Sequence, residues 1–257
     1  MSIKQSFRSI VAAACVTLGL AGAIHAQASV VIAGTRLVYN ARDPEETIKL
    51  SNEGKSPALV QVWIDSGDAN IAPSAIDVPF VVMPPISRID PAKGQTLRVV
   101  YTGEALPQDR ESVFWLNVLE VPPKAAPDEA DVNKLQLAFR SRIKLFFRPA
   151  GLKGLAEEAP AQIVWRLARA GNQPAIEARN PTPFHVSFTA IQVSAGGKTA
   201  TFDDGGMVEP GETKVFPLNK DVTGAANAKV IYRALNDFGG PVDGDATLMQ
   251  GTAESAK

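Results

Sequence analysis

The chain has 257 residues, of which 45% are apolar and 21% are charged, and its formal net charge at pH 7 is −1. This composition excludes an intrinsically disordered chain, and the length is sufficient for two separate hydrophobic cores. A net charge so close to zero excludes a general attraction to nucleic acid or to an anionic membrane surface.

The first 28 residues are typical of a secretory signal peptide. Lys4 and Arg8 form a basic start, and residues 10–24 then form an apolar stretch that is too short to span a bilayer. Small residues permit cleavage after Ala26 or after Ala28, and the pattern Ala-Gln-Ala over 26–28 favours the second position. We therefore expect an exported chain that begins at Ser29. A retained membrane anchor is the alternative that the short apolar stretch disfavours.

Residues 29–149 show short runs in which apolar and polar side chains alternate, with Gly, Pro and Asn turns between them. This pattern predicts β-strands and no helices. The expected strands lie near residues 30–39, 47–52, 58–64, 79–85, 95–101, 112–121 and 135–147. Ala33 and Gly34 interrupt the first run, which indicates a bulge or a switch between two sheets. About seven such strands favour an antiparallel sandwich of immunoglobulin type.

The last strand of this half is the longest alternating run in the chain. From Leu135 to Phe147 the odd positions are apolar except for Ser141, and most even positions are polar or basic. A strand of this length is more than twice the usual one. The extra length indicates a second role, such as pairing with a partner through the strand edge.

Residues 149–154 break the alternation with Pro and Gly and read as a hinge between domains. Weaker strand patterns follow, near residues 162–167, 175–179, 186–193, 199–202, 213–218, 229–235 and 246–249. A second sandwich is the simplest account of them. We therefore expect an all-β protein of two immunoglobulin-like β-sandwich domains, residues 29–149 and 152–257.

The expected mature chain contains few residues suited to catalysis or metal binding. Cys15 and His25 lie in the signal segment, which leaves His185 as the single histidine and no cysteine. A nucleophile–base pair, a zinc site and a phosphate loop are all lacking in the sequence. We expect no enzyme, no metal and no cofactor.

An exported enzyme or a carbohydrate-binding sandwich is the alternative. Sugar binding would need exposed aromatic residues on loops. The tryptophans instead lie inside strand patterns, as core residues would: Trp63, Trp115 and Trp165.

Five motifs carry a resemblance to a known family. In chain order they are Gly34-Thr35-Arg36, Pro84-Pro85-Ile86-Ser87-Arg88-Ile89, Pro107-Gln108-Asp109-Arg110-Glu111-Ser112, Ile143-Lys144-Leu145-Phe146-Phe147-Arg148-Pro149 and Leu235-Asn236-Asp237-Phe238-Gly239-Gly240. Together they resemble the periplasmic pilus chaperones of the chaperone–usher pathway, the PapD-like family. The resemblance implies an L-shaped pair of immunoglobulin-like domains in the periplasm, with fimbrial subunits and an outer-membrane usher as partners.

The resemblance also implies roles for charged residues. Arg36 and Lys144 match the two basic residues that bind the C-terminal carboxylate of the subunit. Glu111, Arg148 and Asp237 match an ion cluster that ties the two domains together. The alternative for Arg36 and Lys144 is an ordinary solvated surface position.

The apolar residues that would fill the open groove of the subunit are, by the same resemblance, Leu135, Leu137 and Phe139. In an ordinary strand these residues would be core. Phe139 and Lys144 differ in parity, so a regular strand points them to opposite faces. If both contact the subunit, twist, a bulge or different contact faces must reconcile them, and we predict an irregularity between Arg140 and Arg142.

Two further expectations concern subfamily and self-association. The segment 122–134 is short and contains no cysteine, and this resembles the short-loop branch of the family. A free strand edge also makes self-association of the unbound protein plausible.

Overall fold

The computed structural model describes residues 29–121, 137–222 and 228–248. Its strands are β1 Val30–Ile32, β2 Arg36–Asn40, β3 Glu46–Asn52, β4 Ala58–Asp65, β5 Phe80–Met83, β6 Ile86–Ile89, β7 Gly94–Tyr101, β8 Ser112–Val121, β9 Phe139–Arg148, β10 Val164–Ala170, β11 Gln173–Arg179, β12 Val186–Ala195, β13 Lys198–Phe202, β14 Gly206–Val208, β15 Thr213–Pro217, β16 Lys229–Leu235 and β17 Pro241–Thr247. Two short 3-10 helices, η1 Pro73–Ala75 and η3 Ala156–Gln162, lie between strands. Within the described ranges, no helix has the length and apolar character needed to cross a membrane.

The first domain is a sandwich of two sheets with the strand orders β1-β3-β7-β5 and β2-β9-β8-β4-β6. Alternate residues of each strand face inwards, as the period of two predicts. They form one core, in which Leu50, Leu97 and Leu145 are fully buried. An aromatic group at one end of this core places the Tyr39 ring 5.7 Å from that of Phe80.

The chain changes sheets between β1 and β2. Strand β1 pairs antiparallel with β3, whereas β2 pairs in parallel with β9 in the facing sheet. Gly34 lies between them at φ 147°, in a region that favours glycine. The sequence allowed either a bulge or a switch between two sheets at Ala33 and Gly34, and the structure shows the switch.

The second domain is also a sandwich. Its sheets have the orders β10-β11-β15 and β13-β12-β16-β17, with β14 pairing to β12. Trp165 lies in its core at 1% exposure, packed against Phe188 and Tyr232. The prediction of an all-β chain with two immunoglobulin-like sandwiches is therefore confirmed.

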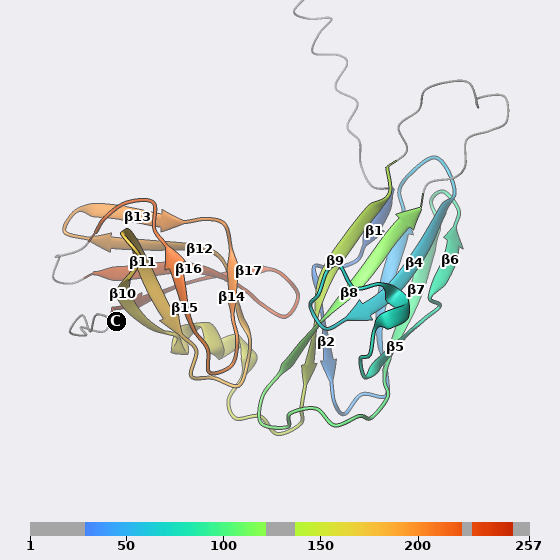
Figure 1. Ribbon diagram of the computed structural model, residues 1–257, viewed down its shortest axis with the longest axis horizontal. Helices are drawn as coiled ribbons and strands as arrows, with labels where there is room; N and C mark the ends of the chain where they lie inside the picture. The colour runs from blue at the N-terminus through green and yellow to red at the C-terminus, as the bar shows by residue number, and fades with distance from the viewer. Residues whose placement is uncertain (1–28, 122–136, 223–227, 249–257) are drawn as a thin grey trace, which may run out of the picture.

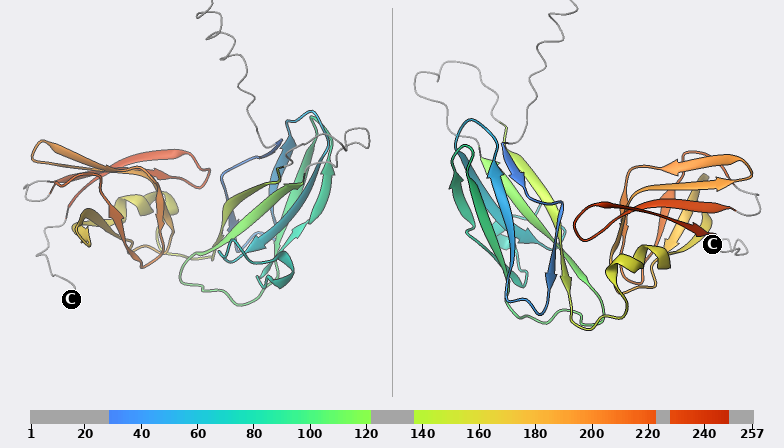
Figure 2. Two further views of the ribbon diagram at one scale, coloured as in Figure 1. Left: turned by 45° about the horizontal axis from the view of Figure 1, so that its top comes forward. Right: turned by 180° about the vertical axis from the view of Figure 1, so that it is seen from behind.

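The two sandwiches meet at one end and diverge at an angle, which gives the expected L shape (Figures 1 and 2). The hairpin between β16 and β17 extends from the second domain towards the first (Figures 1 and 2). Residues from both domains thus come together at the inner corner, where the candidate site lies.

Candidate functional site

Arg36 and Lys144 lie side by side, because β2 pairs with β9 in the register that sets these two residues opposite each other. Both side chains are half-buried. The Arg36 guanidinium lies 5.5 Å from the Phe146 ring centroid, and its Nη1 donates to the Leu235 carbonyl at 3.5 Å. Its Nε is buried without a hydrogen-bond partner. Among the described residues, neither cation has a carboxylate within ion-pair distance.

The electrostatics of this pair favour binding of an anion. Burial lowers the pKa of Arg36, and the charges of Asp237 and Glu111 only partly oppose this effect. Burial also lowers the pKa of Lys144, and the positive charges of Arg36 and of Lys214 on β15 lower it further. An incoming carboxylate would relieve both effects. Lys214 was missed by the sequence reasoning, since it is close to the pair only in space.

Other basic residues on the same face of β9 are neutralised. Arg142 Nη2 lies 2.7 Å from Asp65 Oδ1, and Arg140 Nη2 lies 3.5 Å from Asp65 Oδ2. The Asp65 side chain is 1% exposed. Lys144 follows on this face, yet its ammonium contacts only an aromatic ring, that of Trp115 at 5.4 Å. Lys144 therefore differs from its neighbours in lacking an acidic partner among the described residues.

Two tryptophans lie outside the core, contrary to expectation. Arg140 stacks over Trp63 at 4.9 Å and Arg142 over Trp115 at 4.7 Å, on the outer face of the sheet. Both indoles are only half-buried, and Trp165 alone of the three is a core residue. The strand pattern predicted that both tryptophans lie in strands, but it did not predict that they lie on the outer face of the sheet. On that face guanidinium groups cover the indoles, whereas a core residue would be covered by the second sheet.

Strand β9 has a free edge along half of its length. It pairs with β8 from Phe139 to Phe147, but β2 covers only Lys144 to Arg148. Among the described residues nothing pairs with residues 139–143 on that side. The switch of the chain between β1 and β2 leaves this edge open.

The predicted irregularity between Arg140 and Arg142 is wrong. The register with β8 is continuous from Phe139 to Phe147. Phe139 lies on the core-facing row that continues to Ile143, whereas Lys144 lies on the outer row, so the two residues serve different faces of a regular strand.

The apolar residues at the start of β9 extend beyond the core. Phe139 is half-buried, and Leu137, just before the strand, is 49% exposed. Leu135 lies outside the described residues. Within those residues the strand begins at Phe139 and ends at Arg148.

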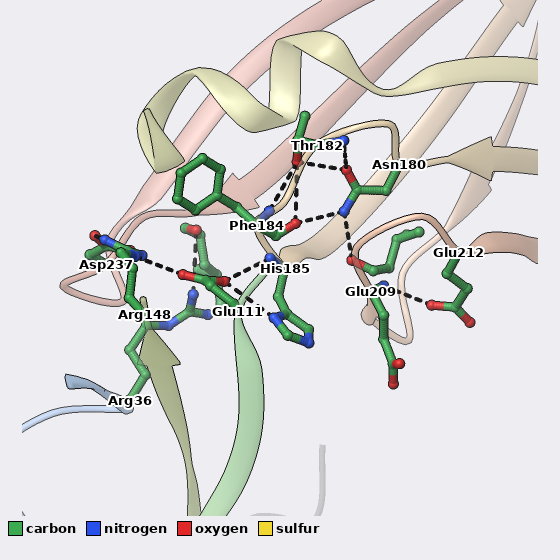
Figure 3. Close-up of polar contacts among 12 residues, drawn as sticks. Arg36, Glu111, Arg148, Asn180, Thr182, Phe184, His185, Glu209, Glu212 and Asp237 are labelled. Atoms are coloured by element: carbon green, nitrogen blue, oxygen red, sulfur yellow. Dashed lines mark hydrogen bonds and ion pairs between the residues drawn. The ribbon is translucent and has the colours of Figure 1, made fainter. Parts of the chain in front are cut away.

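The expected ion cluster joins the two domains (Figure 3). Arg148 Nε donates to Glu111 Oε1 at 2.7 Å, and its two terminal nitrogens donate to the Asp237 oxygens at 2.6 and 2.8 Å. Burial alone would lower the pKa of Arg148, but the hydrogen bond to Asp237 and the charge of Glu111 outweigh it and raise that pKa. The cluster fixes the β16–β17 hairpin against β9.

His185 belongs to the same cluster and was not assigned to it from the sequence (Figure 3). Its backbone nitrogen donates to Glu111 Oε2 at 2.8 Å, and its Nδ1 lies 3.2 Å from the same oxygen. The turn before it is held by Asn180, whose side chain donates to the Phe184 carbonyl at 2.7 Å. The Asn-Pro-Thr-Pro turn was the available signal for a fixed backbone here.

The hairpin tip packs closely on the first domain. A Cβ at Gly239, which has φ +79°, would lie 2.0 Å from Thr35 Oγ1. Asn236 Oδ1 accepts from the backbone nitrogens of Phe238 and Gly240 and so fixes the turn. Phe238 itself is 92% exposed. Glycine at 239 thus permits the close contact that sets Asp237 against Arg148.

No group of three or more potential metal ligands lies together in the part of the chain that the structure describes. The corner where the domains meet thus presents a fixed interdomain contact and a cation pair without an acidic partner among the described residues. The free edge of β9 runs away from this pair towards the start of the strand. This arrangement suits the binding of an extended peptide with a terminal carboxylate.

Comparison with known proteins identifies the family of this chain. The family model described as "Pili and flagellar-assembly chaperone, PapD N-terminal domain" matches residues 29–153, and "Pili assembly chaperone PapD, C-terminal domain" matches residues 158–246. The probable fimbrial chaperone YadV of Escherichia coli K12 is 46% identical over 224 residues, which cover 86% of this chain and 90% of YadV. The crystal structure of YadV superposes with a TM-score of 0.73 at 43% identity, over 86% of this chain and all of that one.

Two further solved structures are similar. The SafB chaperone of Salmonella enterica, solved in complex with the SafA pilin, has a TM-score of 0.69 at 30% identity and covers 87% of this chain and 98% of its own. The periplasmic chaperone SfaE has a TM-score of 0.62 at 28% identity, over 86% of this chain and all of that one. The chain therefore belongs to the PapD-like family of periplasmic pilus assembly chaperones, whose members are not enzymes.

Proposed function

We propose that this chaperone holds fimbrial subunits at the corner between its domains, lends them a strand from residues 135–139, and delivers them to an outer-membrane usher. The similarity to SafB, which was solved with a pilin, supports the class of client. A subunit that lacks its last strand exposes core and unpaired backbone groups and would aggregate.

The carboxylate anchor is the pair Arg36 and Lys144. The observation that carries this assignment is that the pair is half-buried and has no acidic partner among the described residues. A C-terminal carboxylate would gain charge-assisted hydrogen bonds from both cations. It would also fix the register of the added strand, since a slip by one residue exchanges the faces of every side chain.

The donated strand supplies both hydrogen bonds and apolar contacts. The free edge at residues 139–143 offers its backbone groups to the subunit. Leu135, Leu137 and Phe139 would fill the open groove, at about 1.5–3 kcal/mol for each large side chain buried, or roughly 5–9 kcal/mol for three before ordering costs. The exposure of Leu137 in the free protein supports this role.

The subfamily is a finer assignment that rests on the sequence. The short, cysteine-free segment 122–134 assigns the protein to the short-loop branch of the family. The free edge of β9 also makes the unbound chaperone prone to self-association, which the subunit would prevent by occupying the edge.

Co-purification with a fimbrial subunit encoded beside the chaperone tests the anchor. Arg36→Ala or Lys144→Ala is expected to reduce the amount of recovered complex at least about tenfold. This factor corresponds to a loss of about 1.4 kcal/mol of binding free energy, which is the contribution of one charge-assisted hydrogen bond. The wild-type chaperone should capture a subunit that is extended by a few residues at its C-terminus as poorly as these variants capture the normal subunit.

Arg166→Ala and Lys198→Ala are matched controls, because both residues are exposed and lie in the second domain. Circular dichroism of each variant establishes that it is folded. Full recovery of the subunit with both Arg36→Ala and Lys144→Ala would refute the anchor.

A further inference from the structure

Glu120 binds the start of strand β1. The backbone nitrogen of Ser29 donates to Glu120 Oε2 at 2.9 Å, and that of Val30 donates to the same oxygen at 3.1 Å. The Ser29 hydroxyl donates to Glu120 Oε1. One carboxylate thus accepts three hydrogen bonds from two consecutive residues, yet no basic side chain of the described residues forms an ion pair with it.

Residue 29 is enclosed on its other sides as well. Glu53 N donates to the Ser29 carbonyl at 2.7 Å. A Cβ at position 54 would lie 2.5 Å from the Ser29 Cβ, so glycine is required there for the present packing. The backbone of β1 is therefore fixed from its first residue, and the close approach of Gly54 favours a small side chain at position 29.

The position of Glu120 relates this contact to the candidate donor strand. Glu120 lies opposite Phe139 in the ladder between β8 and β9. It ends the row of β8 residues that face the core, after Leu116 and Val118. Since β1 belongs to the facing sheet, the bond from Ser29 to Glu120 closes the sandwich at the end where β9 begins.

We propose that Glu120 is the binding site for the α-ammonium group that signal cleavage creates at Ser29. Hydrolysis of the Ala28–Ser29 peptide bond by a signal peptidase adds one water, whose hydroxyl goes to the Ala28 carbonyl carbon and whose proton goes to the Ser29 nitrogen. The released amine takes a second proton from solvent at neutral pH. The neutral N–H donor to Glu120 thereby becomes a cation, and an ion pair replaces a hydrogen bond in which only the acceptor carries a charge.

The consequence is that processing fastens β1 to its own sheet. A strand held at Ser29 by Glu120 and along its length by β3 stays away from the open edge of β9 at residues 139–143. Removal of the signal thus completes the first domain while leaving that edge available to a partner.

Two measurements test the proposal. The intact mass of the protein recovered from the periplasm is expected to correspond to residues 29–257, and a mass corresponding to residues 27–257 would overturn it. Thermal unfolding is then measured for chains that start at Ser29 or at Ala28, each with Glu120 and with Glu120→Gln. In the longer chain the nitrogen of Ser29 is an uncharged amide.

Glu120→Gln is expected to lower the Tm of the Ser29 chain by roughly 4 °C, and that of the Ala28 chain by less than half as much. Equal losses in the two chains would mean that the positive charge on the Ser29 nitrogen adds nothing to the bond with Glu120, and this result would overturn the proposal. Glu53→Gln removes a neighbouring exposed acid without touching the ammonium, so it should leave both Tm values unchanged. All variants contain residues 29–257 in full, so both domains are present in every measurement.

Discussion

At the scale of single residues, the candidate site is defined by charges that lack partners. Arg140 and Arg142 share the buried Asp65, and Arg148 is held between Glu111 and Asp237. Arg36 and Lys144 lie between these two neutralised groups, and within the described ranges neither has an acidic partner. A half-buried cation without a partner costs stability, so its presence indicates a role in binding.

Replacement of Lys144 by methionine should stabilise the free chaperone while it abolishes capture of the subunit. Methionine keeps the contact with Trp115 and removes a cation whose pKa is lowered by burial and by Arg36. We expect the Tm to rise by about 2 °C at pH 7. Because the pKa of Lys144 is lower in the folded state, the charged ammonium destabilises the folded protein fully at neutral pH. This destabilisation disappears as the pH rises to the ordinary lysine pKa of 10.5, so the difference in Tm between the variant and the wild type should shrink as the pH is raised.

Arg142→Met is the matched control, since Arg142 also stacks on Trp115 but pairs with the buried Asp65. It should destabilise the protein by about 1–3 kcal/mol. A lower Tm for Lys144→Met than for the wild type would show that the Lys144 charge is compensated in the free protein.

At the scale of elements, β9 combines three environments in one regular strand. Its odd residues from Ile143 onwards fill the core, its even residues cover the outer face, and its first half offers a free edge. The alternating sequence predicted the strand and its inward row. The length of the strand indicated an edge available to a partner, but not where that edge lies, because this depends on where β2 stops pairing. The sequence also gave no indication of the guanidinium cover over Trp63 and Trp115.

The sequence also predicted only part of the contacts within the cation pair and the interdomain ion cluster. The motifs led correctly to the proximity of Arg36 and Lys144, and to the contacts of Arg148 with Glu111 and Asp237. They gave no indication of His185, because its contact with Glu111 joins residues 74 positions apart across two domains. The expected break at Arg140–Arg142 rested on the assumption that Phe139 and Lys144 share a face, which the regular ladder contradicts.

Replacement of Leu137 by glutamate should weaken complex formation with the fimbrial subunit without loss of stability. Leu137 is 49% exposed in the free chaperone, so a charge there is tolerated, whereas in an apolar groove it would be desolvated. We expect the Kd to rise at least about tenfold, from the lost apolar contact alone. Leu155→Glu, at a comparably exposed leucine in the second domain, is the control. Equal affinities of the two variants would exclude Leu137 from the donated strand.

At the scale of the whole molecule, the angle between the domains depends on a small polar contact. Glu111 and Arg148 of the first domain meet His185 and Asp237 of the second (Figure 3). Gly239 permits the hairpin tip to approach Thr35. The two cores are separate. We therefore expect these charges to contribute to the geometry of the corner, together with the backbone bond from Glu111 N to the Pro183 carbonyl.

The members of this cluster should differ in their importance for stability. Arg148→Ala leaves Glu111, whose side chain is 2% exposed, without its cation and should cost about 3–5 kcal/mol. Asp237→Ala removes a carboxylate that is 40% exposed and should cost about 1 kcal/mol or less, while Arg148 still neutralises Glu111. Urea unfolding gives both values, and small-angle X-ray scattering should show a wider range of interdomain angles for Arg148→Ala.

Arg233→Ala, which breaks the exposed pair with Asp243 on the same hairpin, is the control and should change neither measurement. If the scattering of Arg148→Ala matches that of Arg233→Ala, the cluster does not set the angle between the domains.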